Sequence, residues 1–385
     1  MHIFLTFAVA QLPLLVQAFL LHPHYQSNSK ARLIRLALVP IGVWSLFSFG
    51  SQWRKTLPGW INPSANKNFG QFLIVSALRC MTWGTTSTPY YRLSPSGPPK
   101  KAPEKLSKRL WFALELFCNF RGIGWSFGVP IEAQIQTNTE FLRATYRRLF
   151  INAAVFLTSL ELLALLKDSP YYGMFPFSYL KGLLAMPFFW VMIDSLGCLP
   201  RFMATIFRLD KNEYPFFLNS ALKSSSLTEL WSRRWHSCLR HTLIEAGARP
   251  AYRLMRFVGQ PYLSGRTNEI AQAVGTLSAF LMSGLVHEFG LWYSTHLDRS
   301  FRSTTFFLAQ GVGILLEEGF NRMTGRRVGG WPGWTFVLIW IIFWIRPMVD
   351  AYVEHGMINL DQLPTVIVDH ILKLTTFHSL HHCFK

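Results

Sequence analysis

The sequence predicts an all-α polytopic membrane protein with about eight or nine transmembrane helices and additional amphipathic surface helices. Three features of the composition predict this class. Hydrophobic residues make up 50% of the 385-residue chain, aromatic residues 15%, and charged residues only 15%, against about 25% in soluble domains. Charge this sparse could not cover a soluble surface, which excludes a soluble globular enzyme, a disordered chain and a fibrous repeat.

Eight runs are long and apolar enough to cross a bilayer core, which takes about 20 mainly apolar residues. The first lacks the basic leader and the short apolar stretch of a cleaved signal peptide, so we expect it to be retained as a span. A ninth run, over 364–377, is amphipathic and weaker. The eight stronger runs are 3–21, 33–50, 69–84, 149–166, 180–199, 270–293, 304–320 and 334–350.

Basic residues gather in a few loops between these runs. The chain carries 38 Lys and Arg against 20 Asp and Glu, a net charge of +18. Alternating spans would place the basic stretches 92–109, 201–268 and 322–327 on one side of the membrane. The positive-inside rule makes that side cytosolic, and we expect the membrane to be that of the endoplasmic reticulum. Confinement of the charge to loops argues against a nucleic-acid partner.

Two regions between the spans are too long for simple turns. Within 85–148, the Pro- and Ser-rich piece 94–99 predicts an irregular loop, and the apolar run 110–120 predicts a short interfacial or re-entrant helix. Region 201–268 mixes aromatic residues with arginines, which is typical of helices that lie along a membrane surface. No internal repeat is visible, which disfavours an inverted-repeat transporter.

The cysteines and the C-terminal histidines do not predict a metal site. Five cysteines are spread along the chain without a C-x-x-C pair, so neither a disulfide scaffold nor a zinc ribbon fits. A cluster of metal-like composition lies at the end of the chain and lacks a second ligand pair. Its members are His378, His381, His382 and Cys383.

Ionisable residues inside apolar runs are costly and are therefore candidates for function. Most of them also have a structural interpretation. Glu318 is one turn from Arg322 and is expected to pair with it, while Asp194 and Glu161 are expected to bond to neighbouring helices. The full set is Glu161, Asp194, His287, Glu288, Glu317, Glu318 and Arg346.

His287 differs from the others through its neighbours. Ser283 lies on the same helix face four residues earlier, and Gly284 and Gly290 allow a neighbouring helix or a ligand to approach closely. An imidazole exchanges a proton near neutral pH, which few other side chains do. From the residues alone, His287 is either a structural hydrogen-bonding group or a functional one.

A second constellation is the stretch Trp-Ser-Arg-Arg-Trp-His that begins at Trp231. On a continuous helix, Trp231, Trp235 and Leu239 would form an apolar stripe, and His236 and Arg240 would share another face. An amphipathic surface helix explains this pattern as well as a binding site does.

The third piece is Arg-Gly-Ile-Gly-Trp over 121–125. Two glycines around an aliphatic residue predict a tight passage of the backbone. The piece lacks the Lys-Ser/Thr of a phosphate loop, so that mechanism is not supported.

Taken together and in this order, the three pieces resemble the wax-synthase-like branch of the membrane-bound O-acyltransferase (MBOAT) superfamily. The Trp-Ser-Arg-Arg-Trp-His stretch is followed about fifty residues later by Ser-Gly-Leu-Val-His-Glu, and the 121–125 piece resembles a motif of fungal members. Those members include O-acetyltransferases that act on terpenoids and meroterpenoids. The resemblance covers about 115–350, and Ser232 stands where the family more usually has glycine.

The resemblance implies a multi-helix membrane fold with a tunnel that reaches a buried histidine. It makes 111–350 the catalytic region of a single membrane domain. N-terminal helices and a basic loop (1–110) would precede this region, and a C-terminal helix and tail (351–385) would follow it. His287 would correspond to the family's catalytic histidine, and His236 to the second motif position.

The implied chemistry is transfer of an acyl group from acyl-CoA to a hydroxyl. His287 would act as the general base, and His236 would donate a hydrogen bond to the developing oxyanion. Direct transfer needs neither a metal nor a covalent acyl-enzyme. Arg233 and Arg234, with Trp235, would bind acyl-CoA, although either arginine could equally be a positive-inside marker. The expected substrate-binding residues are Trp231, Ser283 and Glu288.

The function that follows is an acyl-CoA-dependent O-acyltransferase that transfers acetyl from acetyl-CoA to a lipophilic, terpenoid-like alcohol. Its partners would be that alcohol, acyl-CoA and membrane lipids. Within the same class, a long-chain wax-ester synthase would differ in tunnel width. From other classes, a proton-coupled secondary transporter would use His287 with Glu317 and Glu318 as a relay, and in a non-catalytic scaffold both histidines would be replaceable.

Overall fold

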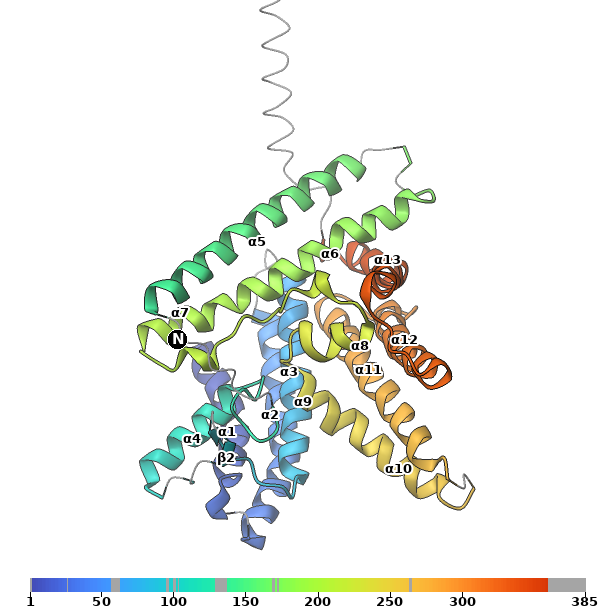
Figure 1. The fold of residues 1–385 in the computed structure, drawn as a ribbon. Helices are drawn as coiled ribbons and strands as arrows, with labels where there is room; N and C mark the ends of the chain where they lie inside the picture. Colours follow the sequence, from blue (N-terminus) through green and yellow to red (C-terminus); the bar gives the residue numbers. More distant parts are fainter. Residues whose placement is uncertain are drawn as a thin grey trace, which may run out of the picture.

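The structure is a computed structural model in which helices dominate (Figure 1). The expected ninth span, 364–377, and the C-terminal cluster with Cys383 lie outside the described residues. The described residues are 2–25, 27–56, 63–94, 97–99, 102, 104–128, 137–167, 170–171, 173–262 and 265–358.

The N-terminal part is a bundle of three long helices with a short fourth helix on its side (Figure 1). The short helix confirms that the apolar run 110–120 does not span, because it has 13 residues. The core between these helices includes the fully buried side chains of Leu14, Leu46, Leu73 and Trp83. The four helices are α1 (His2–Leu20), α2 (Ser29–Thr56), α3 (Pro63–Thr85) and α4 (Leu106–Cys118).

The next three helices are α5 (Asn138–Lys167), α6 (Phe177–Leu196) and α7 (Cys198–Ile206). α5 and α6 lie side by side along one flank of the molecule (Figure 1). Between them, the buried carboxylate of Asp194 accepts hydrogen bonds from Arg148, and from Asn152 at 3.0 Å. The expectation that Asp194 bonds to a neighbouring helix is therefore confirmed.

Short helical pieces connect α7 to the last three helices. Most of them are a single turn, so region 201–268 is less regular than the expected series of surface helices. α10 alone fits that expectation, because it exposes Leu254 and Phe257 beside Arg253 and Arg256. The pieces are η2 (Lys211–Glu213), η3 (Ala221–Lys223), α8 (Leu227–Glu229), the π-helical η4 (Leu230–Arg234), α9 (Arg240–Leu243), the π-helical η5 (Ile244–Ala248) and α10 (Arg249–Gly259).

The last three helices are α11 (Thr267–Ser294), α12 (Arg302–Thr324) and α13 (Gly330–Glu354). α11 is the central one and packs against α3, α10 and α12. Gly284 allows α12 to approach closely, since a Cβ at this position would lie 2.6 Å from the Cα of Thr304.

Six helices among the described residues are long and apolar enough to cross a membrane, and each coincides with an expected span. The other two expected spans, 69–84 and 304–320, are helical as α3 and α12 but more polar. The all-α polytopic class is therefore confirmed. An exception to helix is a small hairpin of β1 (Leu93–Ser94) and β2 (Gly97–Pro99), where we expected an irregular loop.

Buried arginines tie the ends of helices to one another. The guanidinium of Arg35 donates to the carbonyl oxygen of Trp83 near the end of α3, at 2.6 Å. In the same way, Arg79 donates to the carbonyl oxygen of Leu116 near the end of α4, at 2.5 Å. The last carbonyls of a helix have no partner within the helix and carry its negative dipole end, so a guanidinium both satisfies and stabilises them.

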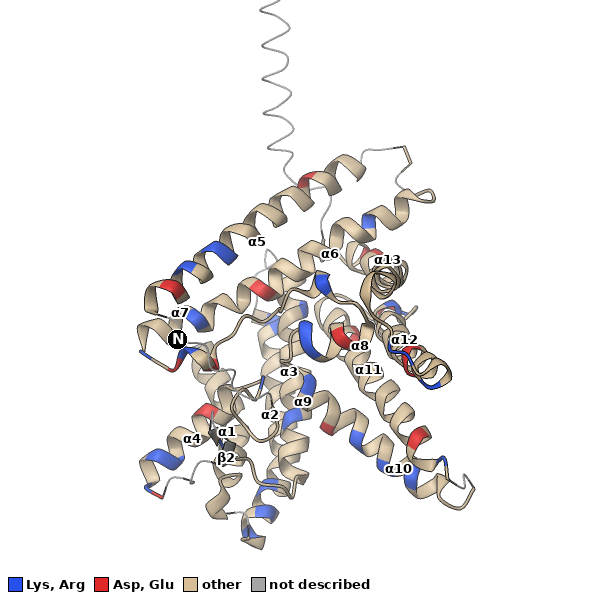
Figure 2. Ribbon diagram, in the orientation of Figure 1, with Lys and Arg blue, Asp and Glu red and all other residues tan. Residues whose placement is uncertain are grey.

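The basic residues of α4, α10 and the C-terminal end of α12 lie toward the same end of the molecule (Figure 2). These helices belong to the three basic stretches that alternating spans place on one side of the membrane. That this side faces the cytosol stays a prediction.

Candidate active site

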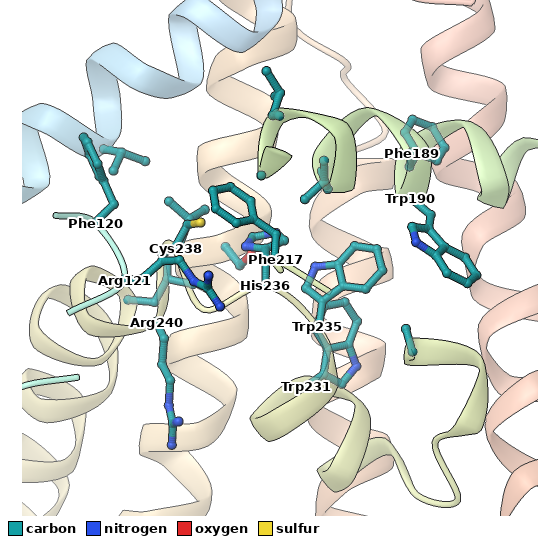
Figure 3. Close-up of a pocket in the computed structure, with 18 of the residues that line it drawn as sticks. Phe120, Arg121, Phe189, Trp190, Phe217, Trp231, Trp235, His236, Cys238 and Arg240 are labelled. Carbon is teal, nitrogen blue, oxygen red and sulfur yellow. The ribbon is translucent and has the colours of Figure 1, made fainter. Parts of the chain in front are cut away.

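A cavity of about 1560 Å³ runs through the middle of the helical assembly. Residues of α3, α4, α6, α7, α11, α12 and α13 line it together with parts of the irregular segment 209–244. Figure 3 shows several of its side chains. Its lining is mostly apolar and rich in aromatic rings, which include Phe189, Trp190, Trp231, Trp235, Phe280, Phe306 and Phe307.

His287 of α11 lines this cavity and is held in one tautomer. Its Nδ1 lies 2.9 Å from the backbone carbonyl oxygen of Ser283. Because a carbonyl oxygen only accepts, Nδ1 must be the protonated nitrogen and donate this bond. Nε2 is then left with its lone pair, as a proton acceptor. The ring also packs against Phe307, with 4.5 Å between the ring centroids.

The continuous helix from Trp231 through Arg240, which was one of two interpretations of this stretch, is not formed. The π-helix η4 ends at Arg234, whose carbonyl oxygen accepts from the backbone N–H of Asn219 at 2.9 Å. Trp235 is extended, with φ −80° and ψ 160°. The Arg234 carbonyl oxygen, which would have accepted the next helical hydrogen bond, is instead bonded to Asn219. His236 and Arg240 therefore do not share a helical face.

His236 follows this break and also lines the cavity (Figure 3). Its Nδ1 is buried and has no hydrogen-bond partner among the described residues. Burial, together with the positive charge of Arg121, lowers the pKa of His236 to about 4. The imidazole is therefore neutral at neutral pH and carries one N–H that a ligand oxygen can accept from.

The glycine pair of the 121–125 piece forms the tight passage that the sequence predicts. Gly122 and Gly124 both have positive φ, at +66° and +71°. A Cβ at Gly122 would lie 2.6 Å from the ring of Phe127. The turn buries Trp125 completely, beside the cavity.

Arg121 connects this turn to the segment that carries His236. Its guanidinium donates to Ser237 Oγ at 3.2 Å and to the carbonyl oxygens of Pro215 and Phe216, at 2.9 and 3.2 Å. Arg121 thus connects the backbone at Pro215 and Phe216 to Ser237, the residue after His236. Figure 3 shows Arg121 beside His236.

Neither Arg233 nor Arg234 is among the residues that line the cavity. Arg234 pairs with Glu229 at 2.6 Å and donates to the carbonyl oxygen of Asn219 at 3.3 Å, so it braces the chain around η4. Arg233 is exposed. The arginines that do line the cavity are Arg92, Arg121 and Arg240.

Of the expected substrate-binding residues, Trp231 and Ser283 line the cavity, as does Trp235, which was expected on the acyl-CoA side. Glu288 is buried elsewhere, because its carboxylate accepts from the backbone N–H of Thr304 at 3.0 Å. It therefore joins α11 to α12 and does not belong to the described cavity lining.

The two carboxylates of the transporter alternative are both engaged in structure. Glu317 accepts from the backbone N–H groups of Leu227 and Thr228, at 2.5 and 2.9 Å, and so caps α8. Glu318 pairs with Arg322 at 2.8 Å, which confirms the expected ion pair. Neither carboxylate lines the cavity, so the structure gives no support to a relay from His287 to this pair.

Sequence reasoning missed Lys67, Gln71 and Tyr352, which all line the cavity. Lys67 lies just before the expected span 69–84 and Gln71 just inside it, where polar residues usually mark a helix end at the membrane surface. Their one signal in the sequence is the four-residue spacing, which puts both side chains on one helix face.

Residues 214–309 match the model of a family described as the membrane bound O-acyl transferase family, and this stretch contains both His236 and His287. The chain is also similar to an acetyltransferase of Arthrobotrys oligospora, at 23% identity over 298 residues, which cover 65% of this chain and 61% of the relative. Similarity to the O-mevalon transferase yanI of Aspergillus niger is 25% over 286 residues, covering 63% and 61%.

A plant relative matches a shorter stretch. The long-chain-alcohol O-fatty-acyltransferase of Simmondsia chinensis is 31% identical over 116 residues, which cover 30% of each chain. The chain thus spans about three fifths of the two fungal relatives and less of this plant relative. The family model and these names confirm the resemblance that the sequence motifs indicated.

Proposed function

We propose that this chain is an acyl-CoA-dependent O-acyltransferase that transfers acetyl from acetyl-CoA to a hydroxyl of a lipophilic, terpenoid-like alcohol. One observation carries the proposal. His287 lies in the stretch that matches the family model, lines a large apolar cavity, and has its Nδ1 proton committed to the Ser283 carbonyl. A fixed, proton-accepting Nε2 inside an apolar cavity is what deprotonation of an alcohol requires.

The transfer then proceeds in one addition and one elimination. His287 Nε2 takes the hydroxyl proton as the alcohol oxygen bonds to the thioester carbonyl carbon, and the carbonyl electron pair moves onto its oxygen. His236 donates its N–H to that oxygen. When the carbonyl re-forms, the C–S bond breaks, and the proton held by His287 goes to the departing thiolate of CoA.

The acyl-CoA side of the cavity is assigned to its polar end. Arg121 and Arg240 line that end. Arg240 is exposed, and its guanidinium donates to the Ser232 carbonyl oxygen at 3.4 Å. We therefore place the CoA phosphates at Arg240, with Arg233 nearby on the outer surface, and the thioester at Trp235. Arg234 is committed to Glu229 and is left to a structural role.

The alcohol side is assigned to the aromatic part of the cavity. Its surface is apolar, yet the indole N–H groups of Trp190 and Trp231 are buried there without partners among the described residues. A lipophilic molecule that carries a few oxygens would pair with these donors, and a plain hydrocarbon chain would not. This favours a terpenoid-like alcohol over a fatty alcohol.

The length of the acyl group is inferred from the names of the similar proteins. Those that match the larger share of this chain are named as an acetyltransferase and an O-mevalon transferase, which supports a short acyl group. The plant relatives are named as long-chain-alcohol O-fatty-acyltransferases. A wax-ester synthase is therefore the second candidate.

The test uses microsomes that contain the protein, radiolabelled acetyl-CoA and a mixed extract of hydroxylated terpenoids. We expect label in an organic-soluble ester with the intact protein and none with the His287→Ala variant. The matched control is His296→Ala, which removes an exposed histidine of the same region that does not line the cavity. Label with palmitoyl-CoA and hexadecanol, and none with acetyl-CoA, would establish the wax-ester alternative instead. No label with either donor would overturn the proposal.

A further inference from the structure

Lys67 is a charged residue of the cavity that the mechanism above leaves unused. It lies on α3, is only 6% exposed, and lines the cavity together with His287. No carboxylate pairs with its ammonium within the described part of the chain. Its Nζ instead lies over the ring of Tyr352, 4.6 Å from the centroid. A buried cation without a counter-ion is strongly unfavourable, which points to an anionic partner supplied by a ligand.

Gly290 brings Lys67 to the reacting end of the cavity. It lies on α11 one turn after His287, where α3 crosses α11. A Cβ at Gly290 would lie 3.1 Å from Cγ of Lys67. The lysine stem thus occupies the space of the missing side chain, and Lys67 and His287 line the same cavity.

Gln71 supplies a second donor on the same face of α3, four residues after Lys67. It lines the cavity, and a Cβ at Gly290 would lie 2.7 Å from its Cγ, so both stems pass the same glycine. Its amide nitrogen is buried and has no hydrogen-bond partner among the described residues. Two donors that lack a carboxylate or hydrogen-bond partner among the described residues therefore lie on one face of α3 where it crosses α11, in the cavity that His287 also lines.

We propose that Lys67 and Gln71 form the oxyanion site of the acyl transfer and receive the negative charge that develops on the thioester carbonyl oxygen. This inference rests on the proposed function. It adds two donors on a rigid helix to the N–H that His236 supplies from the irregular segment.

The charges balance at each stage. Attack by the alcohol oxygen forms a C–O bond and places one negative charge on the former carbonyl oxygen, while the hydroxyl proton becomes a positive charge on His287. Lys67 keeps its proton throughout and neutralises the oxyanion. Collapse of that oxyanion expels the thiolate, which takes the proton from His287. Fixed donors in a low-dielectric cavity stabilise this charge without first having to reorganise.

The experiment compares Lys67→Met, Lys67→Arg and Gln71→Leu with the intact protein, using labelled acetyl-CoA and the acceptor found above. Met keeps the length and apolar character of the lysine stem, and Arg keeps its charge. The matched control is Lys108→Met, which removes an exposed lysine from α4. Binding of S-ethyl-CoA, a thioether that lacks the carbonyl, is measured in parallel and reports that each variant is folded.

We expect Lys67→Met to lower kcat about 100-fold, as on removal of other oxyanion donors. Gln71→Leu should lower kcat only about 10-fold, because a neutral amide is a weaker donor than an ammonium. The KM for acetyl-CoA and the Kd for S-ethyl-CoA should stay within about twofold, since the lost interaction forms only in the transition state. Lys67→Arg should recover part of kcat. The double variant should lose less than the product of the single losses, because both donors act on one oxygen.

Three outcomes would overturn the inference. One is a Lys67→Met enzyme with kcat close to that of the intact protein. Another is a loss confined to the KM of the acceptor, which would make Lys67 a binding residue for an anionic group on the alcohol. The third is an equal loss of S-ethyl-CoA binding, which would make its role structural. Absence of transfer by the intact protein would instead overturn the proposed function, and this inference with it.

Discussion

The two histidines of the cavity differ in their backbone structure and in their hydrogen bonds. His287 lies inside the 28-residue helix α11, and its orientation is fixed by a hydrogen bond to the same helix. His236 lies between the end of the π-helix η4 and the start of α9, on a stretch with no regular structure, and its Nδ1 has no partner in the described part of the chain. We call α11, which carries His287, the helix wall of the cavity, and the irregular segment 209–244, which carries His236, the loop wall.

Each wall depends on a different kind of interaction. The helix wall is positioned by close packing across Gly284 and Gly290. The loop wall lacks the regular backbone hydrogen bonds of a long helix, so its backbone groups need other partners. Charged side chains supply those partners, chiefly Arg121, Arg234 and Glu317. Packing thus sets the position of the base, and charge sets the position of the donor.

The largest expected effect is on the helix wall. His287→Ala in the purified protein should lower kcat by at least about 1000-fold, because it removes the proton acceptor. His236→Ala removes only a donor and should lower kcat by about 100-fold. The measurement is kcat for both variants at saturating acetyl-CoA. Equal losses would break the distinction between a base on one wall and a donor on the other.

The next effect is on the stability of the loop wall. Glu317→Ala leaves the backbone N–H groups of Leu227 and Thr228 buried without their acceptor and should cost about 3 kcal/mol of unfolding free energy. The neighbouring Glu318→Ala breaks an exposed pair with Arg322 and should change the free energy of unfolding far less. Thermal unfolding in detergent measures both. Similar shifts would show that Glu317 does not hold α8.

A third comparison concerns packing in the helix wall. Gly284→Ala puts a Cβ against the backbone of Thr304 on α12 and should destabilise the protein by about 2 kcal/mol. Gly319→Ala is the matched control, since nothing lies within 4 Å of its Cβ position. There the change should be neutral or stabilising by up to about 1 kcal/mol, because alanine favours helix. A Gly284→Ala protein as stable as the control would show that the α11–α12 contact is not tight.

The smallest effect is the pH dependence of the loop wall. The pKa of His236 is about 4 in the folded protein, below the unfolded value of about 6.5. The unfolded chain therefore binds more protons between these values, so stability falls as the pH is lowered from about 6.5 toward 4. His241, also lowered to about 4 by burial, adds to the slope. His236→Gln should flatten the change in melting temperature between pH 7.5 and 5.5, and an unchanged slope would contradict a buried, neutral His236.

The sequence was a better guide to the helix wall than to the loop wall. Apolar runs locate helices because hydrophobic length is itself the physical requirement for crossing a bilayer. Ion pairs one turn apart, such as Glu318 with Arg322, follow from helix geometry alone. The break after Arg234 does not, because it depends on Asn219, fifteen residues earlier, competing for a carbonyl oxygen. The motif spacing singled out His236, which does line the cavity, although a continuous helix does not carry it. Its role as a donor stays a prediction.

Which arginines line the cavity could not be predicted from the sequence either. Arg233 and Arg234 belong to the motif, yet Arg240 and Arg121 line the cavity. Which arginine reaches a cavity depends on where the backbone turns, and a one-residue change in the end of a helix rotates every later side chain by about 100°. Lys67 was missed for another reason, since it becomes a cavity residue only because α3 crosses α11 at Gly290.

The bond from His287 to residue 283 is made with a backbone carbonyl, an atom that every amino acid possesses. A substitution at Ser283 therefore leaves the tautomer of the base intact while it changes the side chain that faces the cavity. Position 283 is thus open to redesign. Larger or smaller side chains there could retune which alcohols the cavity admits without loss of the reactive group four residues away.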